Sequence, residues 1–593
     1  MKYDKGVFDR EVKEYAGLLK GKVENKVVFL IVDINYKNAF YSLATLSRAI
    51  HNLRGDMHVA VIDQKSRTLD VIKDVWDVYR DYKNGLKTEK VIAMLDFIDA
   101  VNKRTGKKAF GEIFKEPDII LNAEKDGFRG TFNLDYKDKW HKEYRWHELI
   151  ETAARIWKEG YALKEGEKVS IGFVFVPSEK DTELPLEDYL DSFSIALAFG
   201  LSAKRLKTNV ALGASTDRAS VLAKAVRTAE LITTLRGCEL DKEVDEEVFK
   251  KFKIFSELLE IEKMEFSSAS IGIHAKGYYG RHFFGEEIGY PTLDKKTRWS
   301  SPGQMMLKDL YSPQTALESR DPVMRYAVTE TLPIDIFIET CYMDYNKLRE
   351  RSAKIKDILK KCEFVRVAGE NANGYRTDFT VGLLAKDGKI KEFIASDSDV
   401  TSVIDKGHYK KTGIKAGMYA NFPSGEAFIT PGTMKGIMVG DVVINIDRSR
   451  VIPEKNPIVV KFNERGYEVI NADPRIWDVM KKEKKEAWQK IIDYEKNKSL
   501  PKEIIEIYKK NFNKVGEFAI NTNPKAKLCD YLIVNEKIAR MIHVALGSGF
   551  EADRKTTYHW DIVVNSPRQK LDIYGIDKNK KQHWIIKKGE FVV

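Results

Sequence analysis

The sequence predicts an α/β N-terminal region built on a mainly parallel sheet, followed by an α+β domain. At 593 residues the chain exceeds the size at which a single hydrophobic core stops growing, so at least two domains are expected. In the first half, strand-length apolar runs alternate with amphipathic helical stretches, which is typical of a parallel sheet covered on both faces. In the second half, short strands and turns dominate.

The N-terminal region is expected to span residues 1–345. Its predicted strands are continuous apolar runs, as strands buried on both faces require. They are Val27–Ile34, His58–Asp63, Asp118–Ala123, Val169–Pro177, Asn209–Ser215 and Ala269–Ala275. Amphipathic patterns at residues 39–53 and 217–235 predict helices between them. A charged stretch near residues 137–150 is a candidate boundary between two smaller units.

The α+β domain is expected over residues 346–593. It begins with a basic amphipathic helix at residues 346–362, which leads into a predicted strand. A charged helix is predicted from Arg475 to Glu495. The chain ends in a predicted hairpin, because two alternating strands flank a polar turn there.

Composition narrows the classes of partner. The formal net charge is +11, but bases and acids interleave in runs such as KKEKKEAWQK, which is typical of a solvated helix face. We therefore expect no nucleic-acid partner. No apolar run is long enough to span a membrane, and the charged N-terminus lacks an apolar signal segment. We therefore expect a cytoplasmic protein without membrane association.

The N-terminal region offers two weak candidates for a ligand site. Residues 213–217 follow a strand and open a helix, where free amides can bind a phosphate, but a helix cap formed by Ser215 or Thr216 explains the pattern better. His274 and His282 lie among glycines and aromatic residues and are candidates for a binding surface. No glycine-rich nucleotide-binding motif occurs in the sequence, and its four cysteines have no metal-type spacing.

The C-terminal domain carries the residues that suggest chemistry. Four acids and two histidines recur there, each inside its own strand-and-turn pattern. Imidazole and carboxylate groups suit zinc, cobalt or manganese, and paired divalent metals are a recurring device for hydrolysis. The predicted metal ligands are Glu426, Glu517, Glu536, His543, His559 and Asp561.

Local patterns support four of these residues separately. His559 and Asp561 are two apart in a strand pattern, so we expect both on one face, with Trp560 packed into the core. A histidine and an aspartate at this spacing are, taken alone, a weak indication of a metal pair. Glu426 and Glu517 are flanked by apolar residues, and a buried acid requires a partner.

Glu536 and His543 lie in the run NEKIARMIHVALG, for which we predict a helix. Seven residues make about two helical turns, so both side chains would share one face with Arg540 between them. The alternative is a solvated glutamate together with a histidine that is satisfied in the core.

The motifs of this domain resemble a known family. The segments RTDFTVGL, NFPSGEAFITP, GEFAI, HVALGSGF and HWD occur in the order found in the aminopeptidase T family of metallopeptidases, over roughly residues 347–593. The resemblance implies two divalent metal ions held by the six residues, a homodimer, and release of N-terminal residues from short peptides by an activated water. A carboxylate must also carry the proton to the leaving amine, and Glu536 and Glu517 are the candidates for this catalytic role.

One position departs from the family pattern. Phe550 stands where a tyrosine is usual, and a phenylalanine cannot donate a hydrogen bond to an oxyanion. Two alternatives therefore stay open: a binding or assembly protein that has lost turnover, and a two-metal hydrolase of a nonpeptide amide. The N-terminal region has no nucleotide-binding loop, so we expect it to contribute shape and to confine substrates to short peptides.

Overall fold

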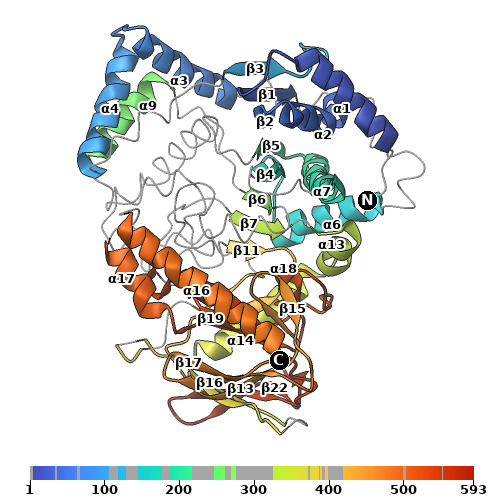
Figure 1. The fold of residues 1–593 in the computed structure, drawn as a ribbon, viewed down its shortest axis with the longest axis vertical. Helices are drawn as coiled ribbons and strands as arrows, with labels where there is room; N and C mark the ends of the chain where they lie inside the picture. The colour runs from blue at the N-terminus through green and yellow to red at the C-terminus, as the bar shows by residue number, and fades with distance from the viewer. Residues whose placement is uncertain are drawn as a thin grey trace. The chain divides into compact units, whose positions relative to one another are not determined.

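The computed structural model of this protein contains two compact units, one within residues 5–338 and one within residues 339–593 (Figure 1). Both mix helices and strands. The structure describes residues 5–33, 37–62, 67–105, 118–128, 145–176, 186–216, 246–260, 269–274, 325–330, 332–370, 374–385, 387–389, 394–398, 419–497, 502–549 and 552–593.

The first unit is organised around a mainly parallel sheet. Its strands, in spatial order, are β7 (Arg325–Glu330), β6 (Ala269–His274), β4 (Lys168–Val176), β5 (Asn209–Thr216), β2 (Asp56–Ile62), β1 (Val27–Asp33) and β3 (Ile119–Asn122). Neighbouring strands are parallel except for β2 and β5, which are antiparallel. The predicted parallel sheet is confirmed, and all six predicted strands are present.

The helices of this unit pack on the sheet or on one another through apolar side chains. Those described are α1 (Lys5–Leu19), α2 (Lys37–Asn52), α3 (Arg67–Lys83), α4 (Glu89–Thr105), α6 (Trp146–Arg155) with its π-helical end (Ile156–Gly160), α7 (Leu186–Arg205), α9 (Glu246–Leu258) and α13 (Ile334–Cys341). Trp76 of α3 meets Phe29 of β1 edge to face, with ring centroids 5.4 Å apart. Helix α2 confirms the prediction at residues 39–53, whereas residues 217–235 lie outside the described part.

The weak ligand candidates of this unit are only partly described. Ser215 and Thr216 end strand β5, but their side chains, like that of His274, lie outside the description, as does His282. Residues 129–144 also lie outside it. Strands on both sides of that segment nevertheless belong to one sheet, because β2 pairs with β5.

The second unit contains two antiparallel sheets. We call the first the site sheet; in spatial order it consists of β10 (Ala395–Ser396), β12 (Glu426–Ile429), β18 (Val515–Asn521), β19 (Ile542–Gly547), β20 (His559–Val564), β14 (Val443–Asn445) and β15 (Ser449–Val451). The second sheet consists of β17 (Gly466–Asn471), β16 (Ile458–Asn463), β13 (Thr433–Gly440), β9 (Asp378–Gly382), β8 (Cys362–Ala368), β21 (Asp572–Asp577), β22 (Gln582–Lys587) and β23 (Glu590–Phe591).

Aromatic side chains join the two sheets of this unit. Phe379 of β9 meets Phe518 of β18 edge to face, with ring centroids 6.3 Å apart, and both side chains are fully buried. Phe518 lies directly opposite Val544 of β19, which in turn lies opposite Ile562 of β20, and these are also buried. One face of the site sheet is therefore apolar core, which leaves its other face for polar side chains.

The remaining elements of this unit are four helices and a short strand, of which two helices were predicted. The helices are α14 (Tyr345–Leu359), α16 (Pro474–Lys496), α17 (Lys502–Asn511) and the short α18 (Leu532–Asn535), and a short strand β11 (Tyr419–Asn421) precedes β12. Helices α14 and α16 and the closing hairpin of β21 and β22 were all predicted. Among the described helices of the chain, none is long and apolar enough to cross a membrane.

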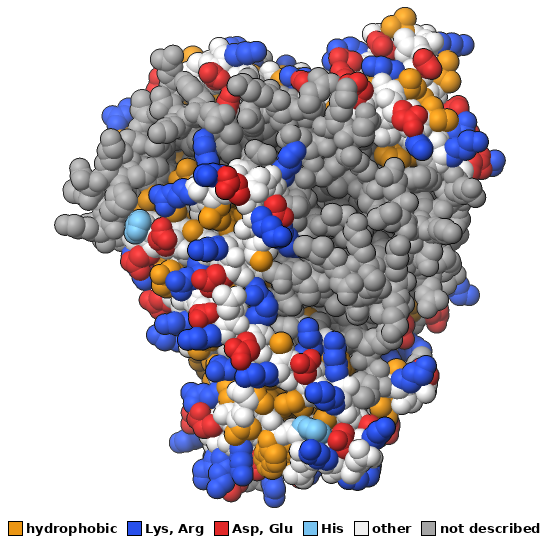
Figure 2. Space-filling view, turned by 180° about the vertical axis from the view of Figure 1, so that it is seen from behind, with side chains coloured by type: hydrophobic (Ala, Val, Ile, Leu, Met, Phe, Trp, Pro, Cys, Tyr) orange, Lys and Arg blue, Asp and Glu red, His pale blue; other side chains and the backbone are white. Residues whose placement is uncertain are grey.

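Charges of both signs are mixed on the described surface. Figure 2 shows Lys and Arg side chains interspersed with Asp and Glu across one face. Pairs such as Lys482 with Glu486, whose charged atoms are 3.8 Å apart on α16, contribute to this pattern. The arrangement is that expected of solvated helix faces, and the absence of a nucleic-acid partner stays a prediction.

The sheet core of the first unit yields a stability prediction. Ile271 of β6 is fully buried, so Ile271→Ala removes apolar contacts and leaves a cavity, which typically costs about 2–5 kcal/mol. Ile254 of α9 is 44% exposed and provides the matched control. We expect Ile271→Ala to lower the free energy of unfolding in urea titrations followed by circular dichroism. Equal losses for Ile271→Ala and Ile254→Ala would contradict the placement of β6 in the core.

Candidate metal centre

Five of the six predicted metal ligands lie on one face of the site sheet. Successive residues of a strand alternate between faces, and directly opposed residues of neighbouring strands share a face. The register of β12, β18, β19 and β20 puts the five side chains on the face that points away from Phe518. These residues are Glu426, Glu517, His543, His559 and Asp561.

Small residues make room between these side chains. Ala519 of β18 lies opposite His543, and Ala545 of β19 lies opposite both Glu517 and Asp561. A larger side chain at either alanine would project from the same face and fill the space among the acids. The alanines therefore let the acids and histidines of neighbouring strands approach one another on this face.

The five residues form two groups that share one carboxylate. The first group is Glu426, Glu517 and His543, and the second is Glu517, His559 and Asp561; within each, one atom per residue lies within 4.8 Å of the others. His543 Nε2 is 3.4 Å from Glu517 Oε1 and 3.5 Å from Glu426 Oε2. His559 Nε2 is 3.2 Å from Glu517 Oε2 and 3.1 Å from Asp561 Oδ1.

Both imidazole rings are held by their other nitrogen. His543 Nδ1 is 2.8 Å from Asn521 Oδ1, and His559 Nδ1 is 2.7 Å from the carbonyl oxygen of Ser548. These oxygens accept hydrogen bonds, so each Nδ1 is the donor, and in a neutral ring the Nε2 lone pair then faces the carboxylates. Histidine ligands of metals are commonly oriented in this way.

The electrostatics of the cluster show a shortage of positive charge. Burial raises the pKa of Glu426 to about 8, and the charges of Asp397 and Glu517 add to this effect while Lys537 and His543 oppose it. Burial lowers the pKa of His543, but Glu517 and the neighbouring acids outweigh burial and raise it overall. Closely placed buried acids disfavour one another's charged forms unless a cation intervenes.

Two buried atoms without hydrogen-bond partners indicate whether a cation fits this site. Glu426 Oε2 and His543 Nε2 have no hydrogen-bond partner within the part of the chain that the structure describes. A buried polar group in this state costs about 1–3 kcal/mol. Both atoms belong to the first group, and both are ligand types for zinc, cobalt or manganese. The residues present therefore fit a divalent cation.

The structure places Glu536 differently from the prediction. The predicted helix is wrong: α18 ends at Asn535, Glu536 caps it, and His543 lies on strand β19. Arg540 between them has a left-handed backbone with φ of 69°, which a helix does not allow. Hydrogen bonding of β19 to strands on both sides overrides the helical spacing. Glu536 lies outside both ligand groups of the described residues.

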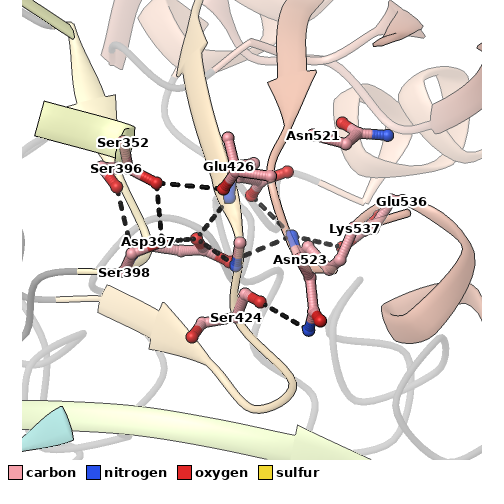
Figure 3. A network of polar contacts seen from close by, with 12 residues as sticks. Ser352, Ser396, Asp397, Ser398, Ser424, Glu426, Asn521, Asn523, Glu536 and Lys537 are labelled. Atoms are coloured by element: carbon pink, nitrogen blue, oxygen red, sulfur yellow. Dashed lines mark hydrogen bonds and ion pairs between the residues drawn. The ribbon is translucent and has the colours of Figure 1, made fainter. Parts of the chain in front are cut away.

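Three further residues belong to the cluster and were not predicted. Asn521 orients His543, and its position four residues after Glu517 on one strand places both on the same face. Lys537 and Asp397 are buried in the network of Figure 3. Asn521 was predictable from strand alternation, whereas the other two sit in charged runs that are typical of solvated turns.

The residues around the metal centre agree in part with what the sequence predicts. Trp560 is buried, as predicted, and packs against Tyr558 with ring centroids 4.6 Å apart. The hydroxyl of Tyr558 lies 2.6 Å from that of Tyr467. Phe550 lies outside the described residues, so the consequence of the missing tyrosine stays a prediction.

Comparisons with known proteins give distant similarity to solved structures and no match to a family model or a curated sequence. Among solved structures, wild-type AmpT from Thermus thermophilus is similar with a TM-score of 0.40 and 13% identity, over 75% of this chain and 99% of that chain.

The orientation of His543 yields a prediction for metal binding. Asn521→Ala removes the acceptor of His543 Nδ1 and should weaken divalent-cation binding by about 10–100-fold, as loss of such a supporting contact usually does. Asn511→Ala is the control, because it also removes a buried, hydrogen-bonded amide of this unit. Calorimetric titration of chelator-stripped protein measures both. Equal affinities in the two variants would show that Asn521 does not support a ligand.

Proposed function

We propose that this protein is a metal-dependent aminopeptidase that releases N-terminal residues from short peptides. The observation that carries the proposal is the convergence of two imidazole Nε2 atoms and three buried carboxylates, with each Nδ1 held by a protein acceptor. The order of sequence motifs, which resembles the aminopeptidase T family, supports a peptide as the substrate.

Each ligand group would hold one divalent cation. Glu426, Glu517 and His543, the first group, would hold one cation, and Glu517, His559 and Asp561, the second group, would hold the other. Such cations, when bound, lower the pKa of a water molecule, polarise the scissile carbonyl and bind the free α-amine of the substrate. Zinc, cobalt and manganese all suit this mixture of imidazole and carboxylate.

The protein supplies orientation, a dry environment and a proton carrier. Asn521 and the Ser548 carbonyl fix the two rings before any substrate arrives. Burial of the acids strengthens each electrostatic interaction, because the surrounding dielectric is low. Glu517 belongs to both ligand groups, so we assign it to cation binding and assign Glu536 to moving the proton to the leaving amine.

Chemistry at the α-amine gives the most direct test. Chelator-stripped protein is reconstituted with Zn²⁺, Co²⁺ or Mn²⁺ and assayed on amino-acid amides, dipeptides and the same dipeptides with an acetylated N-terminus. We expect hydrolysis of the free peptides and none of the acetylated ones. Bound metal without turnover would instead support a binding protein, and turnover restricted to nonpeptide amides would support a different hydrolase.

Substitution of the second group yields a prediction for activity. His559→Ala and Asp561→Ala each remove one ligand, so we expect lower metal content by elemental analysis and loss of peptide hydrolysis, with the circular dichroism spectrum retained. His583→Ala is the control, since His583 pairs with Asp577 in the second sheet at 2.9 Å. If either site variant kept the parent's metal content and rate, the assignment would be wrong.

A further inference from the structure

A buried lysine lies beside the first ligand group. The side chain of Lys537 is fully buried, and its Nζ is 2.6 Å from Glu426 Oε1, 3.0 Å from Glu536 Oε1 and 3.3 Å from Asp397 Oδ2 (Figure 3). Burial by itself lowers the pKa of Lys537, but the three carboxylates outweigh burial and raise the pKa well above its usual value. The three ion pairs, at 2.6, 3.0 and 3.3 Å, hold the side chain as an ammonium in this position.

Hydrogen bonds of the backbone fix the segment of Lys537 relative to that of Glu426. The Asn523 amide N–H donates to the carbonyl of Lys537 at 3.0 Å, and the Asn523 side-chain amide donates to the carbonyl of Ser424 at 2.9 Å. Asp397 Oδ1 accepts the backbone N–H groups of Gly425 and Glu426, each at 2.9 Å. The turn that leads into β12 is thus fixed against the segment that carries Lys537.

Gly425 allows this close approach. Its φ is 138°, and a Cβ at this position would lie 2.7 Å from the backbone nitrogen of Asn523, which is too near for any side chain. Gly425 thus lets the turn that precedes Glu426 lie against Asn523, whose backbone N–H donates to the carbonyl of Lys537.

Lys537 acts on the two ligand groups unequally. It takes one oxygen of Glu426, a ligand of the first group, and leaves Oε2 to face His543 at 3.5 Å. The ion pairs that Lys537 forms with described residues go to Glu426, Glu536 and Asp397, whereas the second group consists of Glu517, His559 and Asp561. An ammonium repels a divalent cation and competes for the carboxylate that would bind it.

We propose that Lys537 makes the two cation positions unequal, so that the position of Glu517, His559 and Asp561 fills first and the position of Glu426, Glu517 and His543 fills second and more weakly. This inference rests on the metal centre of the proposed function and goes beyond it. Lys537 is a positioning residue of the metal centre. It fixes one oxygen of Glu426 and lowers the affinity of the first group (Glu426, Glu517 and His543) for its cation. Glu536 and Asp397 hold the ammonium in place.

Cobalt titration of chelator-stripped, full-length protein at constant pH tests the effect of Lys537. We expect two binding steps of different affinity in the parent, followed by calorimetry and by the visible absorption of Co²⁺. In Lys537→Met, which keeps the length of the side chain without its charge, the weaker step should tighten about tenfold or more and the tighter step should change by less than about threefold. Lys484→Met is the control, since Lys484 is also partly buried but donates to Tyr467 at 2.8 Å and forms no ion pair with these acids among the described residues.

Two ligand variants test the order of filling without altering Lys537. Glu426→Gln should remove the weaker step and keep the tighter one, and His559→Ala should remove the tighter step. Equal steps in the parent, the reverse assignment in these variants, or a Lys537→Met protein whose weaker step is lost or unchanged would overturn the inference.

The outcome is distinguishable from failure of the proposed function. Two unequal cobalt steps, the weaker of which tightens in Lys537→Met, would support the role of Lys537 even in a protein that hydrolyses no peptide, and would then reject the aminopeptidase alone. A parent that binds no Co²⁺ would reject the metal centre and this inference together.

Discussion

The compensation of buried negative charge is the constraint on which the C-terminal unit depends. The cluster contains five buried carboxylates, and three of them contact the buried ammonium of Lys537; the five are those of Asp397, Glu426, Glu517, Glu536 and Asp561. A buried charge without a partner costs several kcal/mol. With both histidines neutral, five carboxylates and one ammonium leave a net charge of −4. Two divalent cations would neutralise this charge. Burial raises the pKa of Glu426 and of Asp397, and for Glu426 the charges of Asp397 and Glu517 add to the effect of burial.

The apolar core determines where these charges lie. Phe518 packs on Phe379 of the second sheet, so the alternate residue Glu517 must lie on the opposite face of β18. A slip of one residue in the register would bury the acids in the core and move Phe518 to the polar face. The same hydrophobic contacts that join the two sheets therefore align the acids and histidines of four strands.

The sequence predicts what depends on local periodicity and misses what depends on distant contacts. The strands of the first unit are continuous apolar runs and were predicted, whereas β7 begins with Arg325 and ends with Glu330 and was missed. The shared face of His559 and Asp561 follows from a period of two. The segment before His543 fits both helical and extended periods, and pairing with β18 and β20 decided between them. Lys537 and Asp397 resemble solvated residues until the chain folds them onto Glu426.

The cluster also bears on the choice among functions. In a protein that bound no cation, Glu426 Oε2 and His543 Nε2 would face each other at 3.5 Å among the buried acids, without a hydrogen bond to the described residues. Replacing such a cluster with apolar side chains of similar volume is often neutral or stabilising by about 1–4 kcal/mol. A fold that contains this arrangement is thus better explained by bound cations than by a purely structural role.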